Sequence, residues 1–332
     1  MRILFAGSPA IAVPALGIMS ALSGEGFVLA GLLTNPDNPR GRSGKPEPTD
    51  CAAALPRLFT DPIPLLKPEK LDHAAREQVA ALKPDILVSF AYGSIFGPKF
   101  LALFPQGGIN IHPSLLPQYR GPAPIPAAIL NRETETGITI QRLAEAMDCG
   151  DILVQETVPL NDRETTASLS AIMAQKAAEL LPVALRGLAG GTLQAMPQDH
   201  PAATYCSLLK KGDGLIDWNR SAVEIDAHIR AFDPWPLSFT MHGELQLFIL
   251  KAEALKTSAL PAAADLRAAL PGQVLGKDKN KGILIQTGEG ILAVSELQYQ
   301  TKKALDWKAF LNGTRNFIDA RLGFPPKVPI YE

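Results

Sequence analysis

Cysteine is scarce in this sequence. Three cysteines occur among 332 residues, and they are widely spaced and form no Cys-x-x-Cys pair. Neither a disulfide framework nor a structural zinc site follows from this pattern, so we expect a protein of a reducing compartment. No run approaches the ~20 apolar residues that a transmembrane helix needs. The first residues resemble neither a signal peptide nor a transit peptide, which predicts a cytoplasmic protein without a membrane partner.

An excess of charge of one sign is also missing. The formal net charge is −1, apolar residues make up 46% of the chain and charged residues 20%. This composition is ordinary for a globular protein and excludes extended disorder. A nucleic-acid site would therefore have to be a local patch. The length allows two domains or one large domain, and we expect a monomer.

The first half of the chain alternates apolar runs with helical patterns, as in βα units that build a parallel sheet. Apolar runs predict strands at 3–6, 27–33, 86–91 and 108–112, and a later β pair at 138–143 and 152–158. Helical patterns cover 12–21, 73–82 and 166–187. Residues 1–188 are therefore predicted to form an α/β domain with a Rossmann-like, mostly parallel sheet.

The second half has a different rhythm. Glycine and proline at 190–201 predict a linker over 189–206. Short strands then flank two- or three-residue turns with glycine, at 239–251 and 282–297, which is the hairpin signal. With helices expected at 222–232 and 305–311, residues 207–332 are predicted to form a small β-barrel of the oligonucleotide-binding type. The Ala- and Pro-rich stretch 259–271 is interpreted as a loop insertion in that domain.

The strongest chemical signal lies on the strand predicted at 108–112. Side chains alternate along a strand, so Asn110 and His112 project to the same side. Pro113 ends the strand and places both at its carboxyl end, where open α/β sheets bind ligands. The two side chains could donate hydrogen bonds to one oxygen. The alternative is that Asn110 caps a turn and His112 is a satisfied core histidine.

A second signal is the turn Met147-Asp148-Cys149-Gly150-Asp151 between the strands of the later pair. A carboxylate beside an imidazole favours its charged form and fixes its orientation, and Asp148 is placed to do this for His112. The alternative is a surface turn, an interpretation that suits Asp151 better than Asp148.

An amide, an imidazole and a carboxylate suit acyl transfer without a covalent intermediate. Asn110 and a protonated His112 would stabilise the oxyanion that forms when an amine attacks a formamide carbon, worth roughly 3–4 kcal/mol per donor at comparable sites. Asp148 would hold the imidazole charged and could relay the proton that the amine loses. A serine nucleophile is disfavoured, since Ser114 has no adjacent base and the chain has no Gly-x-Ser-x-Gly elbow.

At these residues the chain resembles the folate-dependent formyltransferase family. It has the family's Asn-x-His strand at 110–112, its Ser-Leu-Leu-Pro turn at 114–117 and its Asp-x-Gly-Asp turn at 148–151. The resemblance implies that Asn110, His112 and Asp148 are the catalytic trio, that 10-formyltetrahydrofolate is the donor and that no metal takes part. It assigns the folate contacts to Ser114, Leu115, Leu116, Pro117, Ile86, Val88, Tyr92 and Gly93.

Within this family the chain is similar, over nearly its whole length, to the branch that acts on tRNA. The similarity rests on residues 5–9, 35–42, 91–93, 119–125, 216–218 and 229–236. Enzymes that formylate glycinamide ribonucleotide lack a second domain, which argues against that branch. The acceptor implied is the α-amino group of methionine charged on an initiator tRNA, with the second domain binding the tRNA.

A loop rich in glycine, proline and basic residues spans 35–48 and carries Arg40, Arg42 and Lys45. Basic side chains can neutralise phosphates of an acceptor stem. The alternative is a solvated polar loop, the commoner fate of such segments. The resemblance favours tRNA contact, most of all for Arg42.

Three other functions stay open. Formylation of an amino-sugar nucleotide would use the same core, and the basic loop and residues 120–125 favour tRNA over it. A dinucleotide-binding dehydrogenase is disfavoured because the turn Gly7-Ser8-Pro9 lacks the three spaced glycines that a pyrophosphate requires. A non-catalytic RNA-binding protein is disfavoured by the intact trio.

Overall fold

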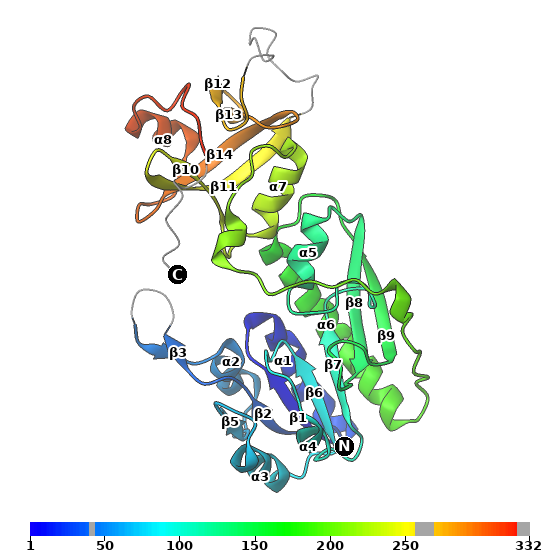
Figure 1. Ribbon diagram of the computed structural model, residues 1–332. Helices are drawn as coiled ribbons and strands as arrows, with labels where there is room; N and C mark the ends of the chain where they lie inside the picture. Colours follow the sequence, from blue (N-terminus) through cyan, green and yellow to red (C-terminus); the bar gives the residue numbers. More distant parts are fainter. Residues whose placement is uncertain (40–43, 256–268, 324–332) are drawn as a thin grey trace, which may run out of the picture. The chain divides into compact units, whose positions relative to one another are not determined.

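A computed structural model describes residues 1–39, 44–255 and 269–323 (Figure 1). The chain divides into two compact units. The first unit comprises residues 1–124, 135–159 and 168–207, and the second comprises 125–134, 160–167 and 208–332. The two units are described separately below.

The first unit is built on a seven-stranded sheet with the order β5-β2-β1-β6-β7-β8-β9. Its strands are β1 (Arg2–Gly7), β2 (Val28–Leu33), β5 (Leu65–Leu66), β6 (Ile86–Phe90), β7 (Gly108–His112), β8 (Glu135–Arg142) and β9 (Ile152–Pro159). Neighbours from β5 to β7 pair in parallel, and β8 and β9 pair antiparallel at one edge. The predicted mostly parallel sheet is confirmed.

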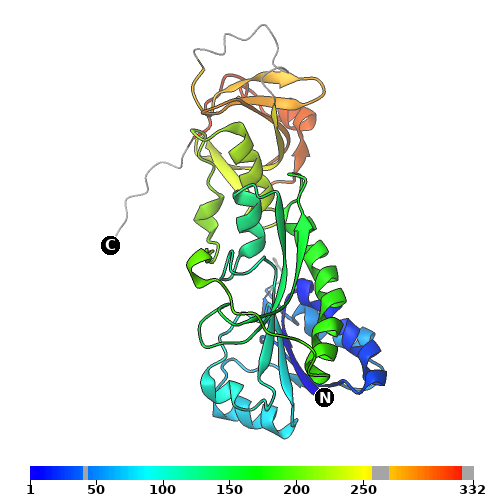
Figure 2. The same ribbon diagram turned by 90° about the vertical axis from the view of Figure 1, so that its right-hand side faces the viewer.

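Helices cover both faces of this sheet, because its central strands are apolar on both sides. The helices are α1 (Val13–Leu22), α2 (Asp50–Leu58), α3 (His73–Ala81), α4 (Pro98–Leu101) and the long α6 (Thr166–Ala189). Helices α3 and α4 lie on one side, and α1 and α6 on the other (Figure 2). Leu4 and Leu87 pack with Val79 of α3 and Phe100 of α4 in one buried cluster.

The second unit is an antiparallel sheet that closes on itself. Its path is β10 (Ser238–His242), β11 (Leu245–Leu255), β14 (Ile291–Tyr299), β13 (Gly282–Gln286) and β12 (Val274–Asp278). Residues 319–323 join the two outer strands: Val274 of β12 bonds to Ala320, and Met241 of β10 bonds to Gly323 in both directions. A sheet joined at both edges is a barrel, as predicted.

Helix α7 (Ala222–Ala231) packs on β11 and β14 of this barrel. Helix α5 (Pro124–Leu130) belongs largely to the same unit. The predicted last helix, 305–311, starts two residues too early, because β15 (Leu305–Asp306) pairs with β14 first. Asp306 then caps α8 (Trp307–Gly313) by accepting from the amides of Lys308 and Ala309. Helices α2, α4 and α5, strand β12 and the two-residue strands β3 (Asn38–Pro39), β4 (Pro46–Glu47), β5 and β15 were not predicted.

Residues 189–206, predicted as a linker, lie along the first unit. Met196 pairs with Ile152 of β9, and Tyr205 pairs with Arg120. The proposed division into 1–188, 189–206 and 207–332 stays a prediction about domains. The loop insertion predicted at 259–271 lies for the most part outside the described residues.

Barrel closure predicts where the second unit is most sensitive to truncation. Phe317 lies just before the closing segment, is 1% exposed and packs edge-on against Phe310. We expect Phe317→Ala to lower the free energy of unfolding of this unit by about 3–5 kcal/mol. The neighbouring Ile318→Ala is the control, because Ile318 is 37% exposed and should cost about 1 kcal/mol or less. All three tryptophans lie in this unit, so tryptophan fluorescence during urea unfolding reports on it; equal costs would contradict the prediction.

A half-buried histidine makes this unit sensitive to acid. Burial lowers the pKa of His228 to about 4, and its ring lies 2.8 Å from Ser238 Oγ and 3.0 Å from the Asp213 carbonyl. The unfolded chain binds the extra proton first, so stability falls as the pH drops from about 6.5 to about 4, by at most about 3 kcal/mol. The pH dependence of the urea midpoint should flatten in His228→Gln and persist in a control, His73→Gln, whose side chain is 78% exposed. An unchanged slope in His228→Gln would contradict this assignment.

Candidate active site

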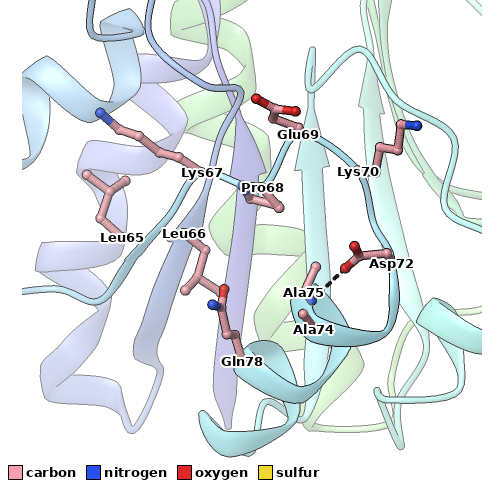
Figure 3. A pocket seen from close by; sticks show the side chains of 10 residues that line it. All are labelled: Leu65, Leu66, Lys67, Pro68, Glu69, Lys70, Asp72, Ala74, Ala75 and Gln78. Atoms are coloured by element: carbon pink, nitrogen blue, oxygen red, sulfur yellow. Dashed lines mark hydrogen bonds between the residues drawn. The ribbon is translucent and has the colours of Figure 1, made fainter.

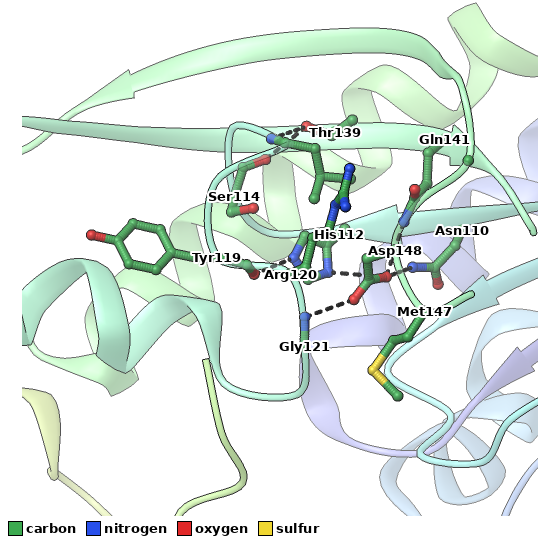
Figure 4. A network of polar contacts seen from close by, with 12 residues as sticks. Asn110, His112, Ser114, Tyr119, Arg120, Gly121, Thr139, Gln141, Met147 and Asp148 are labelled. Carbon is green, nitrogen blue, oxygen red and sulfur yellow. Dashed lines mark hydrogen bonds and ion pairs between the residues drawn. The ribbon is translucent and has the colours of Figure 1, made fainter. Parts of the chain in front are cut away.

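The three predicted catalytic side chains meet at the carboxyl end of β7 (Figure 4). Asn110 Nδ2 donates to Asp148 Oδ1 across 3.3 Å, and His112 Nδ1 lies 3.6 Å from the same oxygen. The side chains of His112 and Asp148 are 5% and 9% exposed. The predicted placement of Asn110 and His112 on one side of the strand therefore agrees with the geometry.

The carboxylate of Asp148 receives further donors from two other segments. Gly121 N–H donates to Oδ2 across 2.9 Å, and the Gln141 amide donates to Oδ1 across 2.9 Å. Gln141 lies opposite Asn110 in the β7–β8 register, so both face the turn. Asp148 itself has a left-handed backbone with φ 54°, a conformation that costs a non-glycine residue about 1–3 kcal/mol unless its surroundings hold it.

The imidazole of His112 is fixed on both sides. Nε2 lies 2.9 Å from the carbonyl oxygen of Tyr119, so Nε2 carries a proton, because a carbonyl can only accept. Burial lowers the pKa of His112, while Asp148 and the Tyr119 carbonyl act in the opposite direction. Burial is the larger of these effects, which runs against the expectation that Asp148 holds the ring charged.

The predicted folate turn at 114–117 is hydrogen-bonded to Thr139 of β8 and to Gln155 of β9. Thr139 Oγ1 donates to the Ser114 carbonyl across 2.7 Å and accepts from the Leu116 amide across 3.2 Å. Ser114 is fully buried, and its hydroxyl donates to the Gln118 carbonyl, which leaves it unavailable as a nucleophile. Leu115 and Pro117 are half-buried.

The other predicted folate contacts differ in exposure. Ile86 and Val88 have no accessible surface, and Tyr92 is 3% exposed. Gly93 follows with φ 89° and is exposed, as is Ile95 at 71%. Contact between folate and these residues stays a prediction, and the buried ones could only shape a pocket from behind.

The predicted tRNA loop is described in part. Arg40 and Arg42 lie outside the described residues, and Lys45 is exposed. Two short strands, β3 (Asn38–Pro39) and β4 (Pro46–Glu47), pair antiparallel at the base of this loop. Lys67 at the end of β5 forms an ion pair with Asp37.

A separate hollow of about 610 Å³ opens where β5 leads into α3 (Figure 3). Its lining is mixed in charge and contains no residue of the trio: Leu65, Leu66, Lys67, Pro68, Glu69, Lys70, Asp72, Ala74, Ala75 and Gln78. Among residues 1–39, 44–255 and 269–323, no three His, Cys, Asp or Glu side chains are grouped to hold a metal. Within the same residues, no helix is both long and apolar enough to cross a membrane.

Several contributors to the site were not predicted. They are Gly121, Thr139 and Gln141, which contact the trio or the folate turn, and Arg120 and Gln198, which lie behind them. The alternation of β8 would have placed Thr139 and Gln141 on one face. Nothing local marks Gln198, which is 50 residues away from Asp148 in the chain.

Comparison with known proteins places both units in one family. Residues 1–185 match the formyl transferase family, and residues 208–315 match the C-terminal domain of formyl transferases. The chain is 51% identical over 324 residues to the methionyl-tRNA formyltransferase of Treponema denticola, spanning 96% of this chain and 98% of that protein. It is 44% identical over 328 residues to the protein of the same name in Treponema pallidum, spanning 97% and 99%.

Solved structures share the fold at lower identity. HypX from Aquifex aeolicus in complex with tetrahydrofolic acid matches with a TM-score of 0.62 and 17% identity, over 96% of this chain and 48% of that chain. An N-formyltransferase from Helicobacter canadensis, solved with folinic acid and dTDP-3-aminofucose, matches with a TM-score of 0.62 and 19% identity, over 89% and 99%. At such identity the likeness concerns the fold alone. With both domains matched and near-full-length relatives at 44–51% identity, the chain belongs to the formyl transferase family.

Proposed function

We propose that this protein transfers the formyl group of 10-formyltetrahydrofolate to the α-amino group of methionyl-tRNA charged on an initiator tRNA. The choice of acceptor is supported by the name of the relatives that match this chain over nearly its full length, methionyl-tRNA formyltransferase. One observation supports the chemistry: Asn110 and His112 both approach the same carboxylate oxygen of Asp148 at the end of β7.

The reaction is a direct acyl transfer. The amine nitrogen bonds to the formyl carbon, the carbonyl oxygen becomes an oxyanion, and the bond from that carbon to N10 of the folate then breaks. The amine loses one proton and N10 gains one. Asp148 is the carboxylate placed to accept the amine proton and pass it on, directly or through water. Asn110 has a second amide N–H with which to stabilise the oxyanion.

His112 would contribute through Nδ1. Its Nε2 proton is held by the Tyr119 carbonyl, so donation to the reacting oxygen would come from Nδ1, which lies 3.6 Å from Asp148 Oδ1. Nδ1 can donate only when the ring is protonated. A developing oxyanion adds negative charge beside the ring and so raises the pKa that burial lowers. The oxyanion thus favours the charged imidazolium as the intermediate forms.

The substrates would approach the carboxyl edge of the sheet. The folate turn at 114–117 follows β7, and Tyr92 and Gly93 follow the neighbouring β6, so both segments lie at the edge where open α/β sheets bind ligands. The loop at 35–48 with Arg40, Arg42 and Lys45 would contact the tRNA acceptor stem, and the barrel would hold the rest of the tRNA.

The proposal is tested by acceptor competition. The purified protein, 10-formyltetrahydrofolate and aminoacylated initiator tRNA should yield formylmethionyl-tRNA. A dTDP-amino sugar offered at the same concentration should yield no product. Formylation of the sugar alone would replace this function with the amino-sugar alternative, and folate binding without transfer to either acceptor would reject catalysis.

The trio should behave as one unit. We expect Asn110→Ala and His112→Ala each to lower kcat by roughly 10²–10³-fold, because each removes an oxyanion donor. The double variant His112→Ala/Asp148→Ala should lose little more than the worse single variant, since residues acting together are not additive. His73→Ala, in an exposed histidine of α3, is the control and should keep full activity. Single losses below tenfold would contradict the assigned roles.

A further inference from the structure

The turn that carries Asp148 is held from behind by a buried glutamine. Gln198 is 6% exposed, and its amide nitrogen donates to the Asp148 carbonyl across 2.9 Å and to the Gly150 carbonyl across 2.6 Å. It also lies 3.2 Å from Gln141 Oε1. Gln198 therefore bonds to the backbone of the catalytic residue and touches the amide that donates to its carboxylate.

The other end of Gln198 is anchored by a buried arginine. Gln198 Oε1 accepts from Arg120 Nη2 across 2.7 Å and from Nε across 3.2 Å. Arg120 is 2% exposed, and none of the ion pairs found among the described residues includes it. Its remaining contacts are His200 Nδ1 at 2.8 Å and the Tyr205 hydroxyl at 3.3 Å. The guanidinium thus depends on neutral acceptors supplied by residues 196–206.

These contacts form a closed ring around the turn. Arg120 precedes Gly121, whose amide donates to the Asp148 carboxylate, and Gln198 links Arg120 back to the Asp148 carbonyl. Glycine is required at two points of the ring. A Cβ on Gly121 would lie 2.3 Å from the Cys206 carbonyl oxygen, and one on Gly150 would lie 1.8 Å from that of Arg142.

We propose that Gln198 is a positioning residue for the formyl transfer, which keeps Asp148 in its left-handed conformation so that its carboxylate faces Asn110 and His112. The proposal rests on the proposed function. A left-handed aspartate is strained, and the two carbonyl bonds from Gln198 hold its peptide in place. Residues 196–206 are then part of the catalytic unit rather than a passive connection to the barrel.

The test is a pair of substitutions at position 198 with a matched control. Gln198→Met removes both halves of the amide, whereas Gln198→Glu keeps an acceptor for Arg120 but cannot donate to the Asp148 carbonyl. Arg2→Met is the control: Arg2 donates to the carbonyls of Leu82 and of left-handed Lys83 at the far end of the sheet. The Arg2→Met substitution also removes side-chain hydrogen bonds to backbone carbonyls at a left-handed residue, but it does so away from the active site.

We expect both Gln198 variants to lower kcat on the order of 10- to 100-fold, as a displaced catalytic group does, with KM for folate and for tRNA within about twofold. Exchange of the Gly121 amide hydrogen should accelerate in both, since its acceptor is the Asp148 carboxylate. Arg2→Met should change none of these values. Wild-type kcat in Gln198→Glu, or unchanged Gly121 exchange, would overturn the proposal.

If the Gln198→Met variant does not fold, the Gln198→Glu variant tests the proposal by itself, because it retains the bond to Arg120. The amide-exchange measurement does not depend on the reaction. If the wild-type protein formylates no tRNA, the proposed function fails while Gly121 exchange still reports on the brace.

Discussion

The buried carboxylate of Asp148 is the constraint on which the site depends. A carboxylate withdrawn from water is stable only if donors replace its hydration. Here the donors come from β7, from β8 and from the loop at 119–121. No single segment can supply them, so the carboxylate is satisfied only once the sheet has assembled with β7 beside β8.

The antiparallel pairing of β7 with β8 brings these donors together. Strand β8 returns beside β7 in a register that sets Asn110 opposite Gln141 and His112 opposite Thr139. All four side chains therefore lie on one face. Asn110 and Gln141 donate to the Asp148 carboxylate, and Thr139 holds the folate turn through the Ser114 carbonyl. One strand pairing thus positions both the predicted proton acceptor and the predicted donor-binding turn.

The sequence predicted the sheet, the barrel and the pairing of Asn110 with His112, because each depends on local patterns: apolar runs, glycine turns and the two-residue period of a strand. Asp148 could be predicted from the sequence because its turn joins two apolar strands. The residues that hold the Asp148 turn in place could not be predicted in this way. Gln198 acts on Asp148 across 50 residues of chain, and its neighbours Pro197 and Asp199 form no pattern that marks it. The start of α8 was missed for a simpler reason, since Asp306 caps the helix after residues that pair with β14.

Satisfaction of the polar groups also bears on how the site responds to substrate. Asn110 donates one amide hydrogen to Asp148, and His112 donates its Nε2–H to the Tyr119 carbonyl. Asn110 keeps a second amide hydrogen, and His112 Nδ1 lies 3.6 Å from Asp148 Oδ1. Burial lowers the pKa of His112 and the Asp148 carboxylate acts against that shift, so further negative charge beside the ring favours a proton on Nδ1. Donation from this nitrogen is therefore stronger toward an oxyanion than toward a neutral formyl oxygen. A donor that strengthens as the reaction proceeds lowers the barrier without tightening the binding of the starting amide.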